Sequence, residues 1–189
     1  IYNCAKNGCQ SALMAPTEIL AEQHFKTLSE ITKESGIKCA LLTGSQTKKQ
    51  KNIIKESLKN GEIDVAVGTH ALLTDDVEFN RLGLVITDEQ HRFGVAQRGK
   101  LSAKGENPHT LVMSATPIPR TLGLIIYGDL DISIIDEYPR GRQKIDTYCV
   151  DTSYRPRIYK YIKKFLNEGR QGYIVCPLVE ENEQNDMTS

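Results

Sequence analysis

A parallel β-sheet with helices on both faces is the fold that this sequence of 189 residues predicts, which places the chain in the α/β class. Two observations support this prediction. Short apolar runs of strand length alternate with amphipathic stretches of helix length, the usual pattern of parallel strands joined by helical crossovers. Glycine, proline and small hydroxyl residues stand between these segments, where turns and helix caps are expected.

Five strands and three helices are expected in the first part of the chain. The strands are predicted at residues 11–15, 38–42, 64–68, 84–88 and 110–114. The first helix should span 18–34 behind the cap residue Thr17, with an inner face formed by Leu20, His24, Leu28 and Ile31. The second should span 46–60, with Ser45 as its cap and Gly61 at its end, and the third 118–127, after Pro117.

A change of composition after Gly128 indicates a second unit. Asp, Pro and Gly are frequent beyond this point, and residues 138–143 have the composition of a linker. Further along we expect a strand at 144–150, a helix at 154–168 and a strand at 173–176. We therefore predict that residues 1–137 form most of one domain and that residues 144–189 begin another.

The composition excludes several classes of protein. The 24 basic and 24 acidic residues balance to zero net charge, which argues against a protein that coats DNA by charge alone. No apolar run is long enough to span a bilayer. The five cysteines form no Cys-x-x-Cys pair, which argues against a metal site or disulfide framework and favours the reducing cytoplasm. Cys39, Cys149 and Cys176 are expected to be buried.

Small or polar residues follow every predicted strand. Because ligands of open parallel sheets bind outside the carboxyl ends of the strands, these positions are the first candidates for a site. They are Pro16-Thr17, Thr43-Gly44-Ser45, Thr69-His70, Asp88-Glu89-Gln90-His91 and Ala115-Thr116. Five such endings in one domain predict a shared polar edge.

The apolar run at 82–87 and the two acids after it give the most specific signal. Asp88 at the tip of a strand could hold a Mg²⁺ ion bound to nucleotide phosphates, and Glu89 could orient or activate the attacking water. For an Asp-Glu pair alone, an acidic turn or helix cap would be the better interpretation. Gln90-His91 directly after it, and residues 114–116 one strand later, favour an ATP-hydrolysing motor.

Such a motor also needs a phosphate-binding loop, Gly-x-x-x-x-Gly-Lys-Ser/Thr. The nearest match begins at Gly94, but Leu101 stands where the Mg²⁺-binding hydroxyl belongs and no strand leads into the segment. We interpret it as an exposed loop and helix. Residues 1–8 have the pattern of a helix end stopped by glycine, so we expect the strand and phosphate-binding loop to precede residue 1.

Three strings resemble the motifs of superfamily 2 helicases. Residues 14–24 are similar to motif Ia, 88–95 to motif II and 114–121 to motif III. Together they resemble the bacterial RecG family of ATP-dependent DNA helicases, which remodel branched DNA and stalled replication forks in recombination and repair. The resemblance continues to residues 172–181 and implies a RecA-like P-loop NTPase domain followed by the start of a second one.

The resemblance implies a role for each matching residue. Asp88 would bind Mg²⁺ through the bound ATP, and Glu89 would be the catalytic base. The residues that would couple hydrolysis to DNA movement are Gln90, His91, Ser114 and Thr116. The residues that would contact DNA phosphates through amides and hydroxyls are Pro16, Thr17, Thr43, Gly44 and Thr69. His24 and His70 are expected to be structural, and the parent protein is expected to be a monomer without membrane contact.

Two other interpretations stay open. The translocase module of transcription-repair coupling factor shares the strings at 91–94 and 116–121, although that family usually has Glu where this chain has Gln90. The chain could also be a non-catalytic DNA-binding module, since it carries no phosphate-binding loop. We therefore expect residues 1–189 alone to hydrolyse no ATP.

Overall fold

The computed structural model describes residues 1–89, 92–115, 131–137, 139, 141 and 145–175. The chain divides into two compact units, Ile1–Ile132 and Ser133–Ser189. No helix among the described residues is long and apolar enough to cross a membrane. The predicted domain limits at 137 and 144 stay a prediction, and the helix expected at 118–127 lies outside the described residues.

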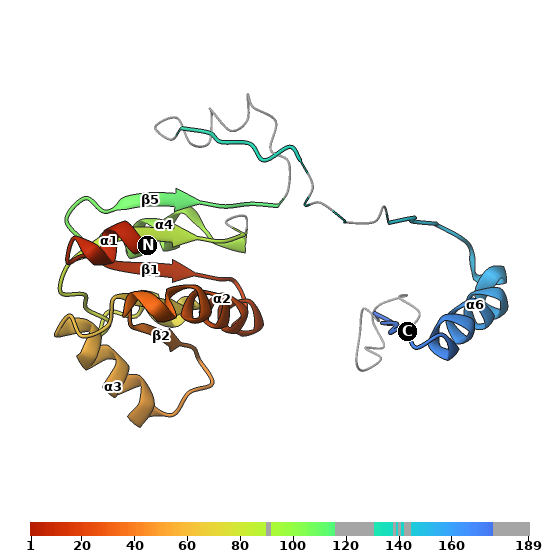
Figure 1. Cartoon of the computed structure of the whole chain (residues 1–189), viewed down its shortest axis with the longest axis horizontal. Helices are drawn as coiled ribbons and strands as arrows, with labels where there is room; N and C mark the ends of the chain where they lie inside the picture. The colour runs from red at the N-terminus through yellow and green to blue at the C-terminus, as the bar shows by residue number, and fades with distance from the viewer. Residues whose placement is uncertain (90–91, 116–130, 138, 140, 142–144, 176–189) are drawn as a thin grey trace. The chain divides into compact units, whose positions relative to one another are not determined.

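The first unit is built on one five-stranded sheet, and all of its described strand pairs are parallel. The spatial order β2-β3-β1-β4-β5 places β1 at the centre (Figure 1). The strands are β1 (Gln10–Met14), β2 (Cys39–Leu42), β3 (Val65–Gly68), β4 (Leu82–Thr87) and β5 (His109–Val112). All five strands predicted from the sequence are confirmed, with bounds that differ by at most two residues.

Helices cover both faces of this sheet, as predicted. One face carries α1 (Tyr2–Lys6), α2 (Glu18–Thr32) and the 3₁₀ turn η1 (Lys33–Ser35). The core on this face contains Leu13, Val67 and Ile86. On the other face α3 (Lys48–Lys59), the 3₁₀ turn η2 (His70–Leu73) and α4 (Val95–Ser102) cover a core that contains Ala12, Met14 and Leu58. Successive residues of β1 alternate between the two cores because side chains of a strand point to opposite faces.

Two details of the predicted helices are wrong. Ile31, assigned to the inner face of α2, is 72% exposed, whereas Thr32 is buried and its hydroxyl donates to Leu28 O at 2.7 Å. Helix α3 begins at Lys48 behind the cap residue Thr47, whose hydroxyl accepts from Gln50 N, rather than behind Ser45. The helix begins later than predicted because the Gln46 side chain is held outside it. This side chain accepts a hydrogen bond from Thr43 N and donates one to Leu41 O.

The second unit contains η4 (Thr152–Tyr154) and α6 (Arg155–Asn167), which confirms the helix predicted at 154–168. Asp151 caps η4 by accepting from Ser153 N at 2.8 Å. The described residues 145–150 and 171–175 form no strand, so the strands expected there are wrong over those residues. A strand needs a neighbouring strand to satisfy its backbone groups, and the described residues of this unit offer none. Cys149, expected to be buried, is exposed, and Cys176 lies outside the described residues.

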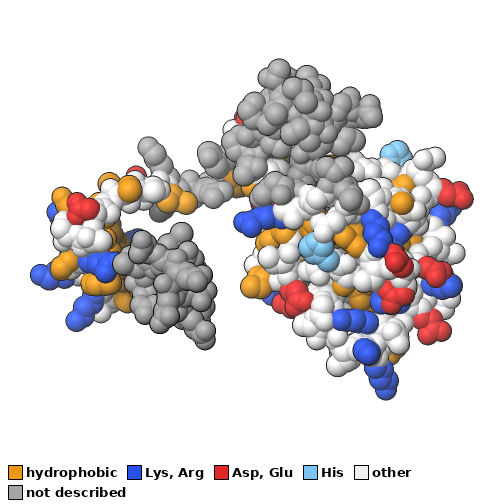
Figure 2. All heavy atoms as spheres, turned by 180° about the vertical axis from the view of Figure 1, so that it is seen from behind, with side chains coloured by type: hydrophobic (Ala, Val, Ile, Leu, Met, Phe, Trp, Pro, Cys, Tyr) orange, Lys and Arg blue, Asp and Glu red, His pale blue; other side chains and the backbone are white. Residues whose placement is uncertain are grey.

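Charged side chains of both signs are interspersed over the face of the first unit drawn in Figure 2. Among the described residues of this unit, ion pairs join Lys55 to Asp76, Lys59 to Glu78 and Lys100 to Asp75, and His24 hydrogen-bonds Asp88. Cations and anions of these pairs therefore neutralise one another, in keeping with the balanced net charge of the chain.

Candidate active site

The tips of three adjacent strands are joined by backbone hydrogen bonds at the carboxyl edge of the sheet. The amide of Asp88, directly after β4, donates to Met14 O of β1 at 2.9 Å. The amide of Met113, directly after β5, donates to Thr87 O of β4 at 2.9 Å. The segments that resemble helicase motifs Ia, II and III therefore leave the sheet side by side, as the parallel topology requires.

Both carboxylate oxygens of Asp88 are engaged. Oδ1 accepts from the Glu89 amide at 2.9 Å, and Oδ2 lies 2.7 Å from His24 Nε2. The Asp88 side chain is 19% exposed, so one edge remains open to a ligand. Two fixed partners from different segments leave the carboxylate little freedom to rotate, which suits a group that must hold a metal ion in one place.

His24 belongs to the candidate site, a placement that the sequence analysis did not predict. Its apolar neighbours at helical spacing predicted a structural role, and its side chain is indeed only 30% exposed. Its ring nevertheless reaches the tip of β4 rather than the apolar core. A polar residue in an otherwise apolar helical face, close behind a strand that ends at the polar edge, was the available signal.

Glu89 has a backbone conformation that side chains seldom adopt. Its φ is +47°, in the left-handed region, and its carbonyl accepts from Arg92 N at 2.9 Å. Left-handed residues other than glycine, asparagine and aspartate are uncommon and cost free energy, so they concentrate at functional sites. The left-handed residue directly follows Asp88, at the position where the sequence predicts the catalytic base.

The structure describes only some of the residues that are predicted to couple ATP hydrolysis to DNA movement. Ser114 lies half-buried, directly after Met113 and next to the motif II segment. Gln90, His91 and Thr116 lie outside the described residues. The predicted coupling between motifs II and III therefore remains a prediction that the adjacency of their strands supports.

The donor set at Asp88 fits a Mg²⁺ ion that is held mainly by a nucleotide. Mg²⁺ usually binds one or two protein carboxylates and completes its octahedron with phosphates and water. The described residues contain no group of three or more His, Cys, Asp or Glu side chains that could enclose a metal. A single oriented carboxylate at the strand tip matches that mode of binding.

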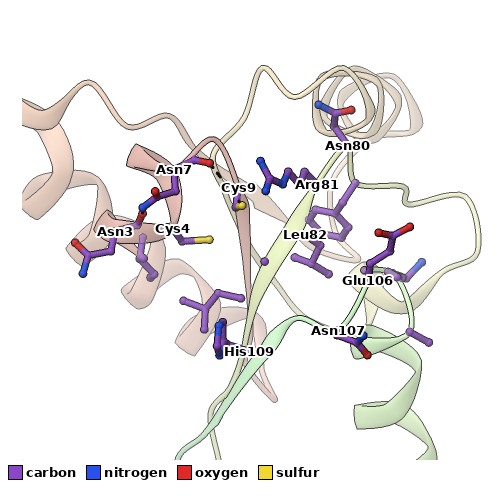
Figure 3. A pocket seen from close by; sticks show the side chains of 17 residues that line it. Asn3, Cys4, Asn7, Cys9, Asn80, Arg81, Leu82, Glu106, Asn107 and His109 are labelled. Atoms are coloured by element: carbon purple, nitrogen blue, oxygen red, sulfur yellow. Dashed lines mark hydrogen bonds between the residues drawn. The ribbon is translucent and has the colours of Figure 1, made fainter.

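A pocket of about 1030 Å³ lies away from these residues, at the amino end of β4 (Figure 3). It is lined by residues from α1, the loop before β4 and the loop before β5, among them Cys4, Arg81 and His109. It contains none of the residues that the sequence predicts for nucleotide or DNA. The candidate active site is defined by the carboxylates of Asp88 and Glu89 and by the carboxyl ends of the strands. The pocket is separate from it.

The loop after β2, predicted to lie along DNA, is held by side chains from two helices. The Glu18 carboxylate, in the first turn of α2, accepts from Ser45 N at 2.9 Å. The Lys51 ammonium of α3 donates to Gly44 O at 2.5 Å. Hydrogen bonds from the Ser45 side chain and amide hold the pKa of Glu18 below its usual range. Lys51 thus helps to fix the shape of this loop.

The predicted DNA contacts fall into two groups. Thr17 and Gly44 are exposed and Pro16 is half-exposed, so they can meet a ligand. Thr43 and Thr69 are 2% and 8% exposed, and their amides already donate to Gln46 Oε1 and Leu42 O. The direct phosphate contacts proposed for Thr43 and Thr69 would compete with these hydrogen bonds, so the exposed group carries the better candidates.

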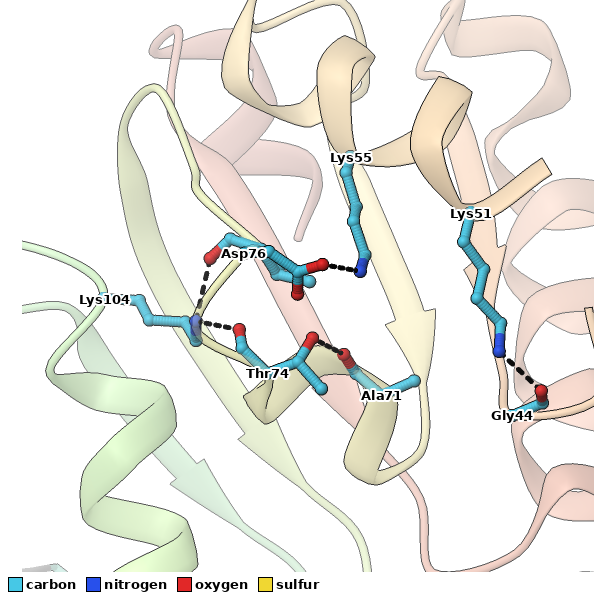
Figure 4. Close-up of polar contacts among 8 residues, drawn as sticks. Gly44, Lys51, Lys55, Ala71, Thr74, Asp76 and Lys104 are labelled. Atoms are coloured by element: carbon cyan, nitrogen blue, oxygen red, sulfur yellow. Dashed lines mark hydrogen bonds and ion pairs between the residues drawn. The ribbon is translucent and has the colours of Figure 1, made fainter. Parts of the chain in front are cut away.

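Lysines also hold the segment that follows η2 (Figure 4). Lys104 donates to the carbonyls of Thr74 and Val77, both at 2.8 Å, and Lys55 pairs with Asp76. The Lys55 ammonium lowers the pKa of Asp76, while burial lowers the pKa of Lys104. These cations stabilise the loop that follows η2 and are engaged within the protein.

Comparison with known proteins assigns the family. The chain matches the DEAD/DEAH box helicase family model over residues 1–125. ATP-dependent DNA helicase RecG of Bacillus subtilis is 51% identical over 187 residues, which are 99% of this chain and 27% of that protein. The protein of the same name from Aquifex aeolicus is 55% identical over 96% of this chain and 23% of its own length. The chain thus spans about a quarter of these relatives.

Solved structures agree with this assignment. A structure of RecG bound to a three-way DNA junction covers 91% of this chain with 47% identity and a TM-score of 0.72, and the match spans 23% of that chain. The structure of the helicase MrfA bound to DNA and AMPPNP is 20% identical, with a TM-score of 0.52, and the match covers 68% of this chain and 18% of that one. At this low identity the similarity shows the fold alone. The predicted RecA-like α/β fold is confirmed. The chain belongs to the DEAD/DEAH box helicase family and resembles RecG helicases over nearly its whole length.

Proposed function

We propose that this chain supplies part of the motor of an ATP-dependent DNA helicase that remodels branched DNA and stalled replication forks in recombination and repair. The observation that carries the proposal is the oriented carboxylate of Asp88 at the tip of β4, beside the strand ends that resemble motifs Ia and III. Identity of about half the residues to RecG helicases over nearly the whole chain supports the same function.

In this proposal Asp88 holds the Mg²⁺ that accompanies ATP, and Glu89 accepts a proton from the attacking water. The metal ion, when bound with ATP, neutralises phosphate charge and so favours attack. The chain's own contribution is to position the groups. His24 and the Glu89 amide orient the Asp88 carboxylate, and the left-handed turn at Glu89 directs the second acid beyond it.

The DNA strand would pass along the exposed ends of the polar edge, near Thr17 and Gly44. The neutral net charge suits such a path, because backbone amides and a few side chains can position phosphates without a broad basic surface. Glu18 and Lys51 would keep the Gly44 loop in a defined shape for this contact. Gln90, His91, Ser114 and Thr116 would transmit the state of the nucleotide to this path.

Further properties of the parent protein belong to the same proposal. Its partners would be ATP and branched or forked duplex DNA, in keeping with the relative whose structure was determined on a three-way DNA junction. We also propose that it acts in the cytoplasm as a monomer without membrane contact. The coupling-factor translocase remains the alternative function, and the identity of about half the residues to RecG helicases favours the first proposal.

Replacement of Glu89 in the full-length protein tests the proposed chemistry. Glu89→Gln preserves the size of the side chain but removes its capacity to accept a proton, so DNA-stimulated ATP hydrolysis should fall at least about a hundredfold. Binding of a fluorescent ATP analogue should change little. Glu34→Gln, at an exposed position of η1, is the matched control and should keep normal turnover.

Normal ATP hydrolysis by Glu89→Gln would contradict the role of this residue, whatever the substrate DNA. The choice between the two helicase classes needs a separate assay. Unwinding of a synthetic three-way junction supports the RecG function, whereas displacement of stalled RNA polymerase without junction unwinding supports the coupling factor. The purified 189-residue chain should hydrolyse no ATP, and robust turnover by it would contradict this expectation.

A further inference from the structure

The end of α1 carries two cysteines at positions 4 and 9. The helix ends in a Schellman motif, in which Gly8 adopts a φ of +68° and its amide donates to Ala5 O at 3.0 Å. The Cys9 amide donates to Cys4 O, also at 3.0 Å. In this motif the two residues joined by the longer hydrogen bond commonly bring their side chains into contact. Here both of those residues are cysteines.

The two sulfur atoms flank one small volume against strand β4. A Cβ atom added to Gly83 would lie 3.3 Å from Cys4 Sγ and 3.3 Å from Cys9 Sγ. It would also lie only 2.8 Å from Cys9 Cβ, so the absence of a side chain at Gly83 leaves the room that both thiols occupy. Figure 3 shows the Cys4 thiol pointing toward Cys9 across this volume.

Both thiols are accessible from the pocket at the amino end of β4. Cys4 and Cys9 are half-buried and line this pocket of about 1030 Å³. Their hydrogen bonds are long, from Cys4 Sγ to Gln10 O at 3.4 Å and from Cys9 Sγ to Asn7 O at 3.8 Å. Cys39 differs from these two cysteines. It lies on the outer strand β2, its Sγ is 3.6 Å from the Thr32 hydroxyl oxygen, and it is not part of the pocket lining.

We propose that Cys4 and Cys9 form a redox-active dithiol that closes to an intrachain disulfide by exchange with low-molecular-weight disulfides such as glutathione disulfide. One deprotonated cysteine attacks a glutathione sulfur, which forms a mixed disulfide and releases one glutathione thiolate. The second cysteine then attacks the protein sulfur of that mixed disulfide and releases the second glutathione thiolate. Two protein thiols are oxidised, one glutathione disulfide is reduced, and the two thiol protons end on the two glutathione molecules.

The geometry of the backbone favours ring closure. Disulfides require Cα atoms within about 7 Å of one another, and the direct hydrogen bond between Cys9 N and Cys4 O holds the two main chains in contact. The closed form would tie the end of α1 to the start of β1. This site lies at the sheet edge opposite Asp88 and is independent of the proposed helicase function.

Trypsin digestion reports the disulfide directly, because Lys6 lies between the two cysteines. The full 189-residue chain is equilibrated in glutathione buffers of different redox ratio, blocked with an alkylating agent and digested without reductant. Mass spectrometry should find the peptide ending at Lys6 joined to the peptide beginning at Asn7. Cys9→Ser should leave only a glutathione adduct at Cys4, whereas Cys39→Ser should close as the native chain does.

Comparison with the unfolded chain separates preorganisation from mere closeness in sequence. If the fold presents the two thiols to one another, the equilibrium constant for closure should be at least about tenfold larger in the native chain than in guanidinium chloride. An equal or smaller constant in the native chain would overturn the proposal. Separate glutathione adducts on Cys4 and Cys9, with no joined peptides, would overturn it equally.

Discussion

His24 Nε2 lies 2.7 Å from Asp88 Oδ2, so the second turn of α2 holds the carboxylate at the tip of β4. The two residues are 64 positions apart in the chain. The contact links the helix that follows the central strand to the residue proposed to hold Mg²⁺. A histidine that hydrogen-bonds such a carboxylate acts as a positioning residue, because it restricts the orientation of the group without touching the substrate.

We expect His24→Ala to lower DNA-stimulated ATP hydrolysis by the full-length protein roughly ten- to a hundredfold, as is typical when the partner of a metal-binding group is lost. The loss should be smaller at high Mg²⁺ concentration, and His24→Gln should recover part of the activity because its amide can donate to Asp88. His109→Ala, at the opposite edge of the sheet, serves as the control. Equal activity of His24→Ala and His109→Ala across a Mg²⁺ titration would contradict the positioning role.

The Glu18 carboxylate should make the stability of the chain depend on acid pH. Hydrogen bonds from Ser45 hold the pKa of Glu18 below the ordinary value of 4.5, so the folded state binds the proton less tightly than the unfolded state. This contribution is fully present above that value and is lost as the pH falls through the lower, folded pKa. Urea unfolding should be measured at a series of pH values from about 5, which lies above the unfolded pKa, downward. The free energy of unfolding should fall less steeply with decreasing pH for Glu18→Gln than for the native chain. An unchanged slope would contradict the assignment, and Glu34→Gln is the control.

Gln10 is a buried polar residue whose replacement should destabilise the first unit strongly. Its side chain is 4% exposed and donates to Leu58 O and Ile63 O at 2.9 and 2.7 Å, while its oxygen accepts from Arg81 N at 3.1 Å. Gln10→Leu leaves these backbone groups without partners, which should lower the free energy of unfolding by about 3 kcal/mol or more. Chemical denaturation followed by circular dichroism measures this loss. The exposed Gln23→Leu should change stability by less than about 0.5 kcal/mol, and a similar small loss for Gln10→Leu would refute the account.

Gly68 permits the close approach of β2 and β3. A Cβ at this position would lie 2.2 Å from Leu42 O, a distance that the backbone must open to accommodate. Gly68→Ala should therefore cost roughly 2–4 kcal/mol of stability and displace the adjacent Thr69. Gly99→Ala provides the contrast, since nothing lies within 4 Å of its added methyl group and the residue sits in α4. It should stabilise the chain by up to about 1 kcal/mol, and the two thermal unfolding midpoints should move in opposite directions.

The fold could be predicted because its signals are local. The five strands are short apolar runs, and the helices between them follow from amphipathic spacing and caps. The details that failed depend on tertiary contacts. Gln46 has a good sequence context for a helix but is bound by the Leu41 and Thr43 backbone, so α3 starts behind Thr47. In α2 the buried stripe includes Thr32 because its hydroxyl is satisfied by Leu28 O.

Only those residues of the candidate active site that directly follow a predicted strand could be identified from the sequence. Asp88 and Glu89 could be identified because an apolar strand leads directly to them. The contact between His24 and Asp88 could not, because it depends on how α2 lies against the sheet. The pairing of Cys4 with Cys9 was missed for a related reason. Their spacing matches no cysteine motif, and only the left-handed turn at Gly8 brings the residues together.

The hydrogen bonds from Asp88 N to Met14 O and from Met113 N to Thr87 O also set the timescale on which the candidate site can rearrange. The Asp88 amide lies between β4 and the central strand β1, so its proton can exchange with solvent only when these strands separate, whereas the Met113 amide follows the outer strand β5. Deuterium would therefore enter the Asp88 amide more slowly than the Met113 amide. The carboxylate of Asp88 is thus attached to a backbone segment that opens rarely, while the strand end on its β5 side opens more readily.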